Sequence, residues 1–83
     1  MKITGTHIRT LSTGDKVLIL LAENEEEQKK LHHYLLIDAY QFKQDVAEDI
    51  PKVDFISAGY KDEDDRIIYD RNLIEIPKWF EKN

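Results

Sequence analysis

The sequence predicts an α+β domain, in which an antiparallel sheet of four to five strands (order β-β-α-β-β-β) has one long helix packed across one face. Three observations support this prediction. The run from Lys16 to Ala22 is apolar without alternation, which is typical of a central strand. A capped helical segment starts near Asn24, and short β-rich segments follow Pro51. At 83 residues, the range 1–83 is expected to form a single compact domain.

The first two strands are predicted to form a hairpin. The segment Lys2–Leu11 is rich in threonine and isoleucine, which favour strands. The residues Ser12–Asp15 have the composition of a turn. The apolar strand Lys16–Ala22 follows at once, and we expect it to lie in the middle of the sheet, covered on both faces.

The helix is expected to run from Glu25 to Asp49. Asn24 has the chemistry of an N-cap, and Glu27 stands three residues later, as in a capping box. Carboxylates in the first turn complement the helix dipole. Pro51 ends the segment because it disfavours helical backbone at the residue before it.

Three further strands are expected after the helix, at Lys52–Tyr60, Arg66–Asp70 and Leu73–Ile76. The polar residues Lys61–Asp65 connect the first two of them, and Arg71-Asn72 turns the chain again. Because one helix covers only one face of a sheet, we expect most of the other face to be open to a partner.

The predicted helix has two apolar stripes at spacings of three and four residues. The stripe assigned to the core contains Leu31, Tyr34, Leu35, Ala39, Phe42 and Val46. The outer stripe contains His33, Leu36, Ile37 and Tyr40. The outer stripe has two interpretations: it is covered by the C-terminal segment with Trp79 and Phe80, or it binds a partner or a second copy of the chain.

Acidic residues are concentrated in two segments. One contains Glu23, Glu25, Glu26 and Glu27, and the other contains Asp62, Glu63, Asp64 and Asp65. The simpler interpretation is a capped helix start and a solvated loop. The alternative is that these carboxylates attract a protein with a basic surface, since clustered charge steers association.

Composition excludes several classes of protein. The absence of cysteine excludes disulfides and thiolate chemistry and is consistent with a cytoplasmic protein. The longest apolar run is far shorter than the ~20 residues that a membrane span requires, so we expect no membrane partner. A net charge of −5 makes nucleic acid an unfavourable partner.

No catalytic, metal or cofactor motif is present, and we expect no cofactor. The neighbouring residues His32 and His33 point about 100° apart on a helix and do not readily chelate one ion. An EF-hand loop starting at Asp62 would require glycine at its sixth position and glutamate at its twelfth, where this chain has Ile67 and Leu73.

These observations favour a non-enzymatic, protein-binding module that acts as an inhibitor, neutraliser or regulator of another protein. Small inhibitors made by mobile elements, which block nucleic-acid-handling proteins, often have this charge and size, and this analogy of class rests on no motif of the chain. The predicted partner-binding residues are His33, Leu36, Ile37, Tyr40, Asp62, Glu63, Asp64 and Asp65. A homodimer through a strand edge or through the outer helix stripe is also compatible with the sequence.

Two other functions remain open from the sequence. A single-stranded nucleic-acid-binding module would stack bases on the aromatic residues Tyr60 and Tyr69, beside Arg66 and Arg71. A small hydrolase or nuclease would use His32 or His33 in acid–base catalysis.

Overall fold

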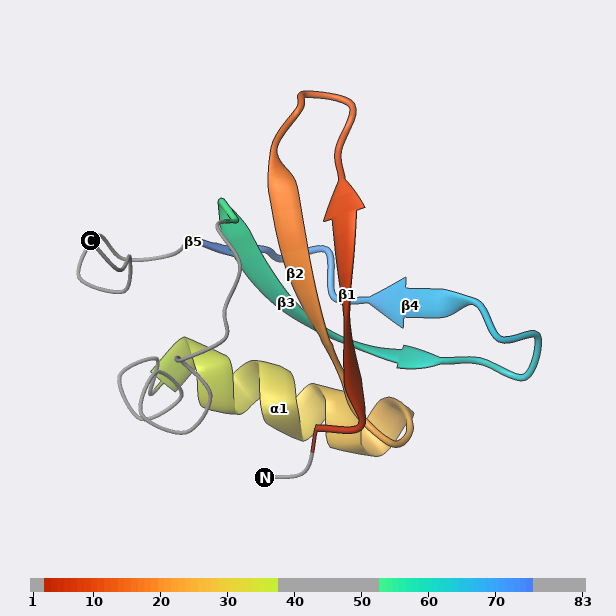
Figure 1. Ribbon diagram of the computed structural model, residues 1–83. Helices are drawn as coiled ribbons and strands as arrows, with labels where there is room; N and C mark the ends of the chain where they lie inside the picture. The colour runs from red at the N-terminus through yellow and green to blue at the C-terminus, as the bar shows by residue number, and fades with distance from the viewer. Residues whose placement is uncertain (1–2, 38–52, 76–83) are drawn as a thin grey trace.

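The computed structural model describes residues 3–37 and 53–75, and within these ranges it is an α+β fold, as the sequence predicts (Figure 1). In chain order the elements are β1 (Gly5–Thr10), β2 (Lys16–Leu21), α1 (Glu25–Ile37), β3 (Phe55–Lys61), β4 (Ile67–Tyr69) and β5 (Ile74–Glu75). The helix starts at the predicted residue. The predicted continuation to Asp49, with its stripe positions beyond Ile37, lies outside the described residues, as do Trp79 and Phe80.

The sheet is mixed, so the prediction of a wholly antiparallel sheet is wrong at one pairing. The strand order is β1-β2-β3-β4, and β5 also pairs with β3. β2 and β3 are parallel, whereas the other pairs are antiparallel. The physical reason is the connection between them: a segment that contains α1 joins β2 to β3, and such a crossover lets the two strands run in the same direction.

The β1–β2 hairpin forms as predicted. The amide of Leu11 donates to the carbonyl of Asp15 at 2.8 Å, and the amide of Gly14 donates to the carbonyl of Leu11 at 2.9 Å. Gly14 has a φ of 92°, in the left-handed region that glycine adopts without a steric penalty. The turn chemistry therefore fixes the register of the hairpin.

β2 is central and covered on both faces, as predicted. Every residue from Val17 to Ala22 is at least nine-tenths buried. On one face Leu18, Leu20 and Ala22 belong to the same buried cluster as Leu31 and Leu35 of α1. This cluster is completed by Val53, Ile56 and Ala58. The spacing of Leu31 and Leu35 therefore provides the contact between the helix and the sheet.

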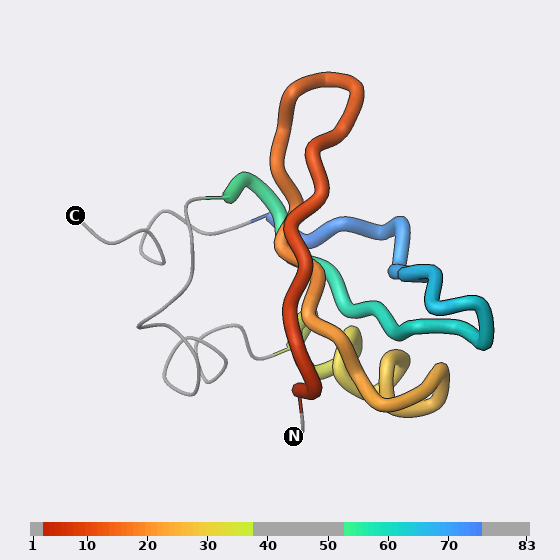
Figure 2. Tube along the Cα trace, turned by 45° about the vertical axis from the view of Figure 1, so that its right-hand side comes forward, coloured from red at the N-terminus to blue at the C-terminus, as the bar shows by residue number. Residues whose placement is uncertain are grey.

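The opposite face is not open, which corrects a second expectation. There Val17, Ile19 and Leu21 form a buried cluster with Tyr69, and Leu11, Phe55, Ile67 and Leu73 pack against it. The sheet twists strongly from β1 to β4 (Figures 1 and 2), so that the side chain of Arg9 on β1 reaches Tyr69 on β4, 5.9 Å from the ring centre, although the two strands stand at opposite ends of the strand order. We call this the concave face.

Gly59 permits the close packing inside the concave face. A Cβ atom at this position would lie 2.7 Å from Ile19 Cγ2 and 2.7 Å from the carbonyl oxygen of Ile68. Side chains do not tolerate such distances, and a carbonyl held in a strand cannot easily move away. The absence of a side chain at Gly59 is therefore required where β2, β3 and β4 come together.

β4 and β5 pair with the same edge of β3 and are separated by the segment 70–73, which we call the bulge. The amide of Asp70 donates to the carbonyl of Ala58 at 2.9 Å. The hydroxyl of Ser57 donates to the carbonyl of Asp70 at 2.6 Å. The predicted turn at Arg71-Asn72 therefore interrupts the strand pairing along one edge of the sheet. The side chains of the turn do not follow the alternation of a regular strand.

Candidate interaction surfaces

The parallel pairing brings the two acidic segments to the same end of the molecule. The carboxyl ends of β2 and β3 lie at one edge of the sheet, and each is followed by an acidic segment. Figures 1 and 2 both place the start of α1 and the β3–β4 connection at this end. Glu23 and Lys61 also line one pocket of about 340 Å³. We call the two segments together, 23–27 and 62–65, the acidic end.

The start of α1 is shaped by its cap. The amide of Glu27 donates to Asn24 Oδ1 at 2.9 Å, which confirms the predicted N-cap. Lys29 lies 3.8 Å from Glu25, and Lys30 lies 3.4 Å from Glu27. Both ion pairs are exposed, and in each the two residues are about one helical turn apart. Exposed pairs of this kind contribute only about 0.3–0.5 kcal/mol each, so they partly neutralise the charge and add little stability.

The acidic residues in the loop of the β3–β4 hairpin have different roles. Asp62 Oδ1 accepts hydrogen bonds from the amides of Asp64 and Arg66, both at 2.9 Å, so Asp62 shapes the loop. Asp65 has a φ of 63° and lies 3.7 Å from Lys61 Nζ. Glu63 and Asp64 are exposed and form no ion pair within the described residues. Of the four predicted positions, these two carboxylates are the ones free to meet a partner.

The outer stripe of the helix is exposed where the structure describes it. Leu36 is 53% exposed, Ile37 is 69% exposed, and His33 is also exposed. Tyr40 lies outside the described residues. These residues occupy the last turns of α1, whereas the acidic end lies at its first turn (Figure 1). The structure therefore does not bring the two halves of the predicted site together.

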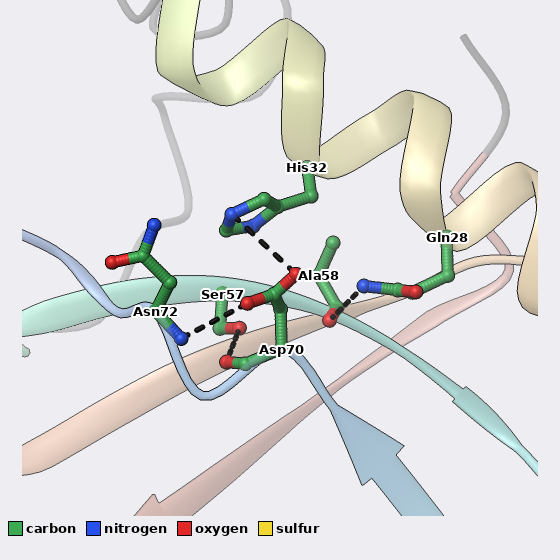
Figure 3. A network of polar contacts seen from close by, with 6 residues as sticks. All are labelled: Gln28, His32, Ser57, Ala58, Asp70 and Asn72. Atoms are coloured by element: carbon green, nitrogen blue, oxygen red, sulfur yellow. Dashed lines mark hydrogen bonds and ion pairs between the residues drawn. The ribbon is translucent and has the colours of Figure 1, made fainter.

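A polar cluster joins α1 to the bulge, and Figure 3 shows its members. His32 is 8% exposed, and its Nε2 lies 3.5 Å from Asp70 Oδ2. Asp70 Oδ1 accepts a hydrogen bond from the amide of Asn72 at 2.9 Å. The side-chain amide of Gln28 donates to the carbonyl of Ala58 at 3.1 Å. The contact between His32 and Asp70 links the bulge to the helix, and the bond from Gln28 links the helix to β3.

Of the described positions of the predicted core stripe, Leu31 and Leu35 are buried and Tyr34 packs against the same cluster, but the buried positions of α1 also include two residues that were not predicted. The buried positions are Gln28, Leu31, His32 and Leu35. The spacing of three, four and seven residues from Gln28 is regular for a helix face, so a signal is present in the sequence. It is concealed because two of the four side chains are polar, and their burial depends on acceptors on β3 and in the bulge, which are distant in the sequence.

Cationic side chains gather on the concave face. The guanidinium of Arg71 lies 4.5 Å from the centre of the Tyr69 ring, and that of Arg9 lies 5.9 Å from it. His7 shares the face of Arg9, because alternate residues of a strand point to the same side. Within the described residues, none of these three basic side chains lies in an ion pair with a carboxylate. We call His7, Arg9 and Arg71 the cationic group.

The aromatic platform required for nucleic-acid binding does not form as predicted. Tyr60 is paired with Ile68, whereas Tyr69 is paired with the adjacent residue Gly59, so the two rings lie on opposite faces of the sheet. Tyr69 is only 7% exposed and is covered by the arginines. Of the two histidines considered for catalysis, His32 is buried and His33 is exposed, so they do not share one site.

Comparison with protein-family models, with curated proteins and with solved structures found no match for this chain. Within residues 3–37 and 53–75, no group of three or more histidine or acidic residues is arranged to hold a metal ion. The helix among these residues is too short and too polar to cross a membrane. The acidic end, the outer stripe and the cationic group are the surface features of the described residues that a partner would meet.

Proposed function

We propose that this chain is a protein-binding module whose acidic end docks on a basic surface of another protein and so inhibits or regulates it. The observation that supports the proposal is the convergence of two acidic segments, far apart in the sequence, at the end where the parallel strands β2 and β3 finish. Nucleic-acid-handling proteins carry basic surfaces of the required kind, and we propose them as the partner class.

The charge at this end is only partly neutralised by the chain itself. Lysines approach Glu25, Glu27 and Asp65. The carboxylates without an ion pair among the described residues are Glu23, Glu26, Glu63 and Asp64. Fields from clustered charges accelerate encounter with an oppositely charged surface and oppose encounter with a like-charged one. Because these carboxylates are exposed, binding should weaken as salt is added.

The outer stripe favours a protein partner over a simple polycation or metal ion. Leu36 and Ile37 are large apolar side chains more than half exposed, and contact with apolar surface of a partner would remove them from water. The stripe and the acidic end lie at opposite ends of α1, so a partner that contacts both must extend along the helix. We propose that Ile37→Asp weakens such binding and leaves the cooperative unfolding of the chain intact.

The test is affinity capture with two charge-matched variants. The double variant Glu63→Gln/Asp64→Asn removes two carboxylates from the acidic end. The control Asp15→Asn/Glu75→Gln removes one carboxylate from the β1–β2 hairpin and one from β5. Asparagine at position 15 keeps an oxygen that can accept the hydrogen bond from the hydroxyl of Thr13. Both variants have the same net charge, so a difference between them reports on position.

The proposal expects one stoichiometric protein partner, captured by the native chain and by the control at low salt. Its capture should fall roughly tenfold with Glu63→Gln/Asp64→Asn, since loss of two favourable charges at an interface costs about 1.4 kcal/mol or more. Equal capture by both variants, or capture that does not change with salt, would contradict the proposed role of the acidic end.

A further inference from the structure

The edge strand β1 leaves half of its backbone groups directed away from the sheet. In an antiparallel pair, residues that exchange hydrogen bonds with the partner alternate with residues that do not. Leu11 bonds to Asp15, so the residues of β1 that point their amides and carbonyls at β2 are Gly5, His7 and Arg9. The amides and carbonyls of Thr6, Ile8 and Thr10 therefore face outward. Within the described residues, no other strand pairs with this edge.

The side chains of β1 do not block this edge. All residues from Thr6 to Thr10 are exposed, and Ile8 is 45% exposed. The strand contains no proline, no lysine and no acidic residue, and its one residue of fixed charge, Arg9, opposes pairing with a basic segment but attracts an acidic one. The edge is thus open to another extended segment.

The cationic group specifies the chemistry of that segment. Arg9 and His7 project from β1 onto the concave face, and Arg71 reaches the same face from the bulge. Arginine forms paired hydrogen bonds with carboxylates, and here both guanidiniums lie against the Tyr69 ring without a carboxylate partner among the described residues. An added strand would direct every second side chain toward His7 and Arg9.

We propose that the edge of β1 binds an extended peptide segment of a partner, with acidic side chains at alternate positions. The outward amides and carbonyls of Thr6, Ile8 and Thr10 would supply backbone hydrogen bonds, and the cationic group would select the acidic side chains. This site goes beyond the proposed function, because it lies on a different surface and has the opposite charge. A second copy of β1 fits less well: pairing Ile8 with its own copy sets Arg9 opposite His7, which leaves the Arg9 guanidinium without an anion.

The test measures the binding of short fluorescent peptides by polarisation. The probe carries glutamate at alternate positions with valine between them. One control peptide replaces each glutamate with glutamine, and another contains the same residues with the glutamates in one block. The proposal predicts saturable binding of the probe and at least about tenfold weaker binding of both controls, because charge-assisted contacts at alternate positions are lost.

Protein variants separate the backbone contribution from the charge contribution. The amide of Ile8 faces outward, so Ile8→Pro removes a donor from the open edge while the β1–β2 ladder keeps its bonds. It should weaken binding of the probe about tenfold, whereas Ile8→Ala, which keeps the amide, should not. Arg9→Gln and Arg71→Gln should each weaken binding severalfold. Arg66→Gln, in the β3–β4 loop, is the matched control and should bind normally.

Thermal unfolding of each variant verifies that the chain remains folded. Probe binding by Ile8→Pro that equals that of Ile8→Ala would overturn the proposal, because the edge would then not be used. Equal affinity for the glutamate and glutamine peptides, or no binding of the probe, would also overturn it. A further result would also overturn the proposal: a native chain that sediments as a dimer and does not bind the probe, with an Ile8→Pro variant that sediments as a monomer. The edge of β1 would then be occupied by a second copy of the chain.

Discussion

The acidic end and the cationic group are opposite in charge and are also built differently. The acidic end consists of a helix start and a hairpin loop, and lysines close to these segments in the sequence approach three of its carboxylates. The cationic group stands on a strand and a bulge, and two of its members rest on a buried tyrosine. A formal net charge of −5 therefore averages over two surfaces that can meet different partners.

Both surfaces depend on contacts between residues that are distant in the sequence. The acidic end exists because β2 and β3 run in the same direction. The cationic group exists because the twisted sheet brings Arg9 of β1 to Tyr69 of β4. Local composition defines which charges are present, and topology decides which of them act together.

The substitution Gly59→Ala should have the largest effect on the surface that carries the cationic group, because the added methyl group overpacks the core beneath it. The added Cβ would meet Ile19 Cγ2 and the carbonyl of Ile68 at 2.7 Å. We expect the free energy of unfolding to fall by about 3 kcal/mol, the upper range for overpacking a core. Gly5→Ala is the control, since its Cβ would meet only Leu21 Cδ1 at 3.7 Å. Chemical denaturation of both variants measures the difference, and equal stabilities would contradict the close packing at Gly59.

The substitution Asp70→Ala should have the next largest effect, because Asp70 holds the bulge that carries Arg71. It removes the acceptor of the Asn72 amide and the partner of His32. Loss of an acceptor beside a buried polar group costs about 1–3 kcal/mol, and partial exposure of Asp70 places the expected loss near 1.5 kcal/mol. In a His32→Leu background the same change should cost less, since no buried imidazole is left without its partner. Denaturation of the four chains gives this coupling directly.

Substitution of Asp62 or Asp64, two carboxylates of the same loop, should have smaller and unequal effects on the free energy of unfolding. Asp62→Ala removes the oxygen that accepts from the amides of Asp64 and Arg66, and we expect a loss of about 1 kcal/mol in the free energy of unfolding. Asp64→Ala should change stability by no more than a few tenths of a kcal/mol, because its carboxylate is exposed. In partner capture the order should reverse, with Asp64→Ala the more damaging. The same order in both measurements would contradict the division of roles.

The sequence was sufficient for features that rest on neighbouring residues. The N-cap at Asn24, the turn before Asp15 and the buried strand around Ile19 were predicted and are present. Each of them depends on residues that lie close together in the chain. Helix and strand propensities therefore gave the elements that the structure describes, with ends that differ by one to a few residues.

The features that sequence reasoning missed depend on long-range contacts. The direction of β3 relative to β2 follows from the path of the connecting segment. The burial of His32 requires Asp70, which lies far along the chain. The role of Gly59 requires β4 to approach β2. Alternation and spacing contain no information on these distances, so the concave face and the cationic group could not be derived from them.

The parallel pairing of β2 with β3 creates the acidic end, and one measurement tests this pairing directly. The chain contains no cysteine, so Asp64→Cys accepts a single spin label. The label should broaden the amide signals of residues 23–27 much more than those of residues 12–14, in the hairpin at the other end of β2. Stronger broadening of residues 12–14 would mean that β3 runs antiparallel to β2, and the acidic end would not exist.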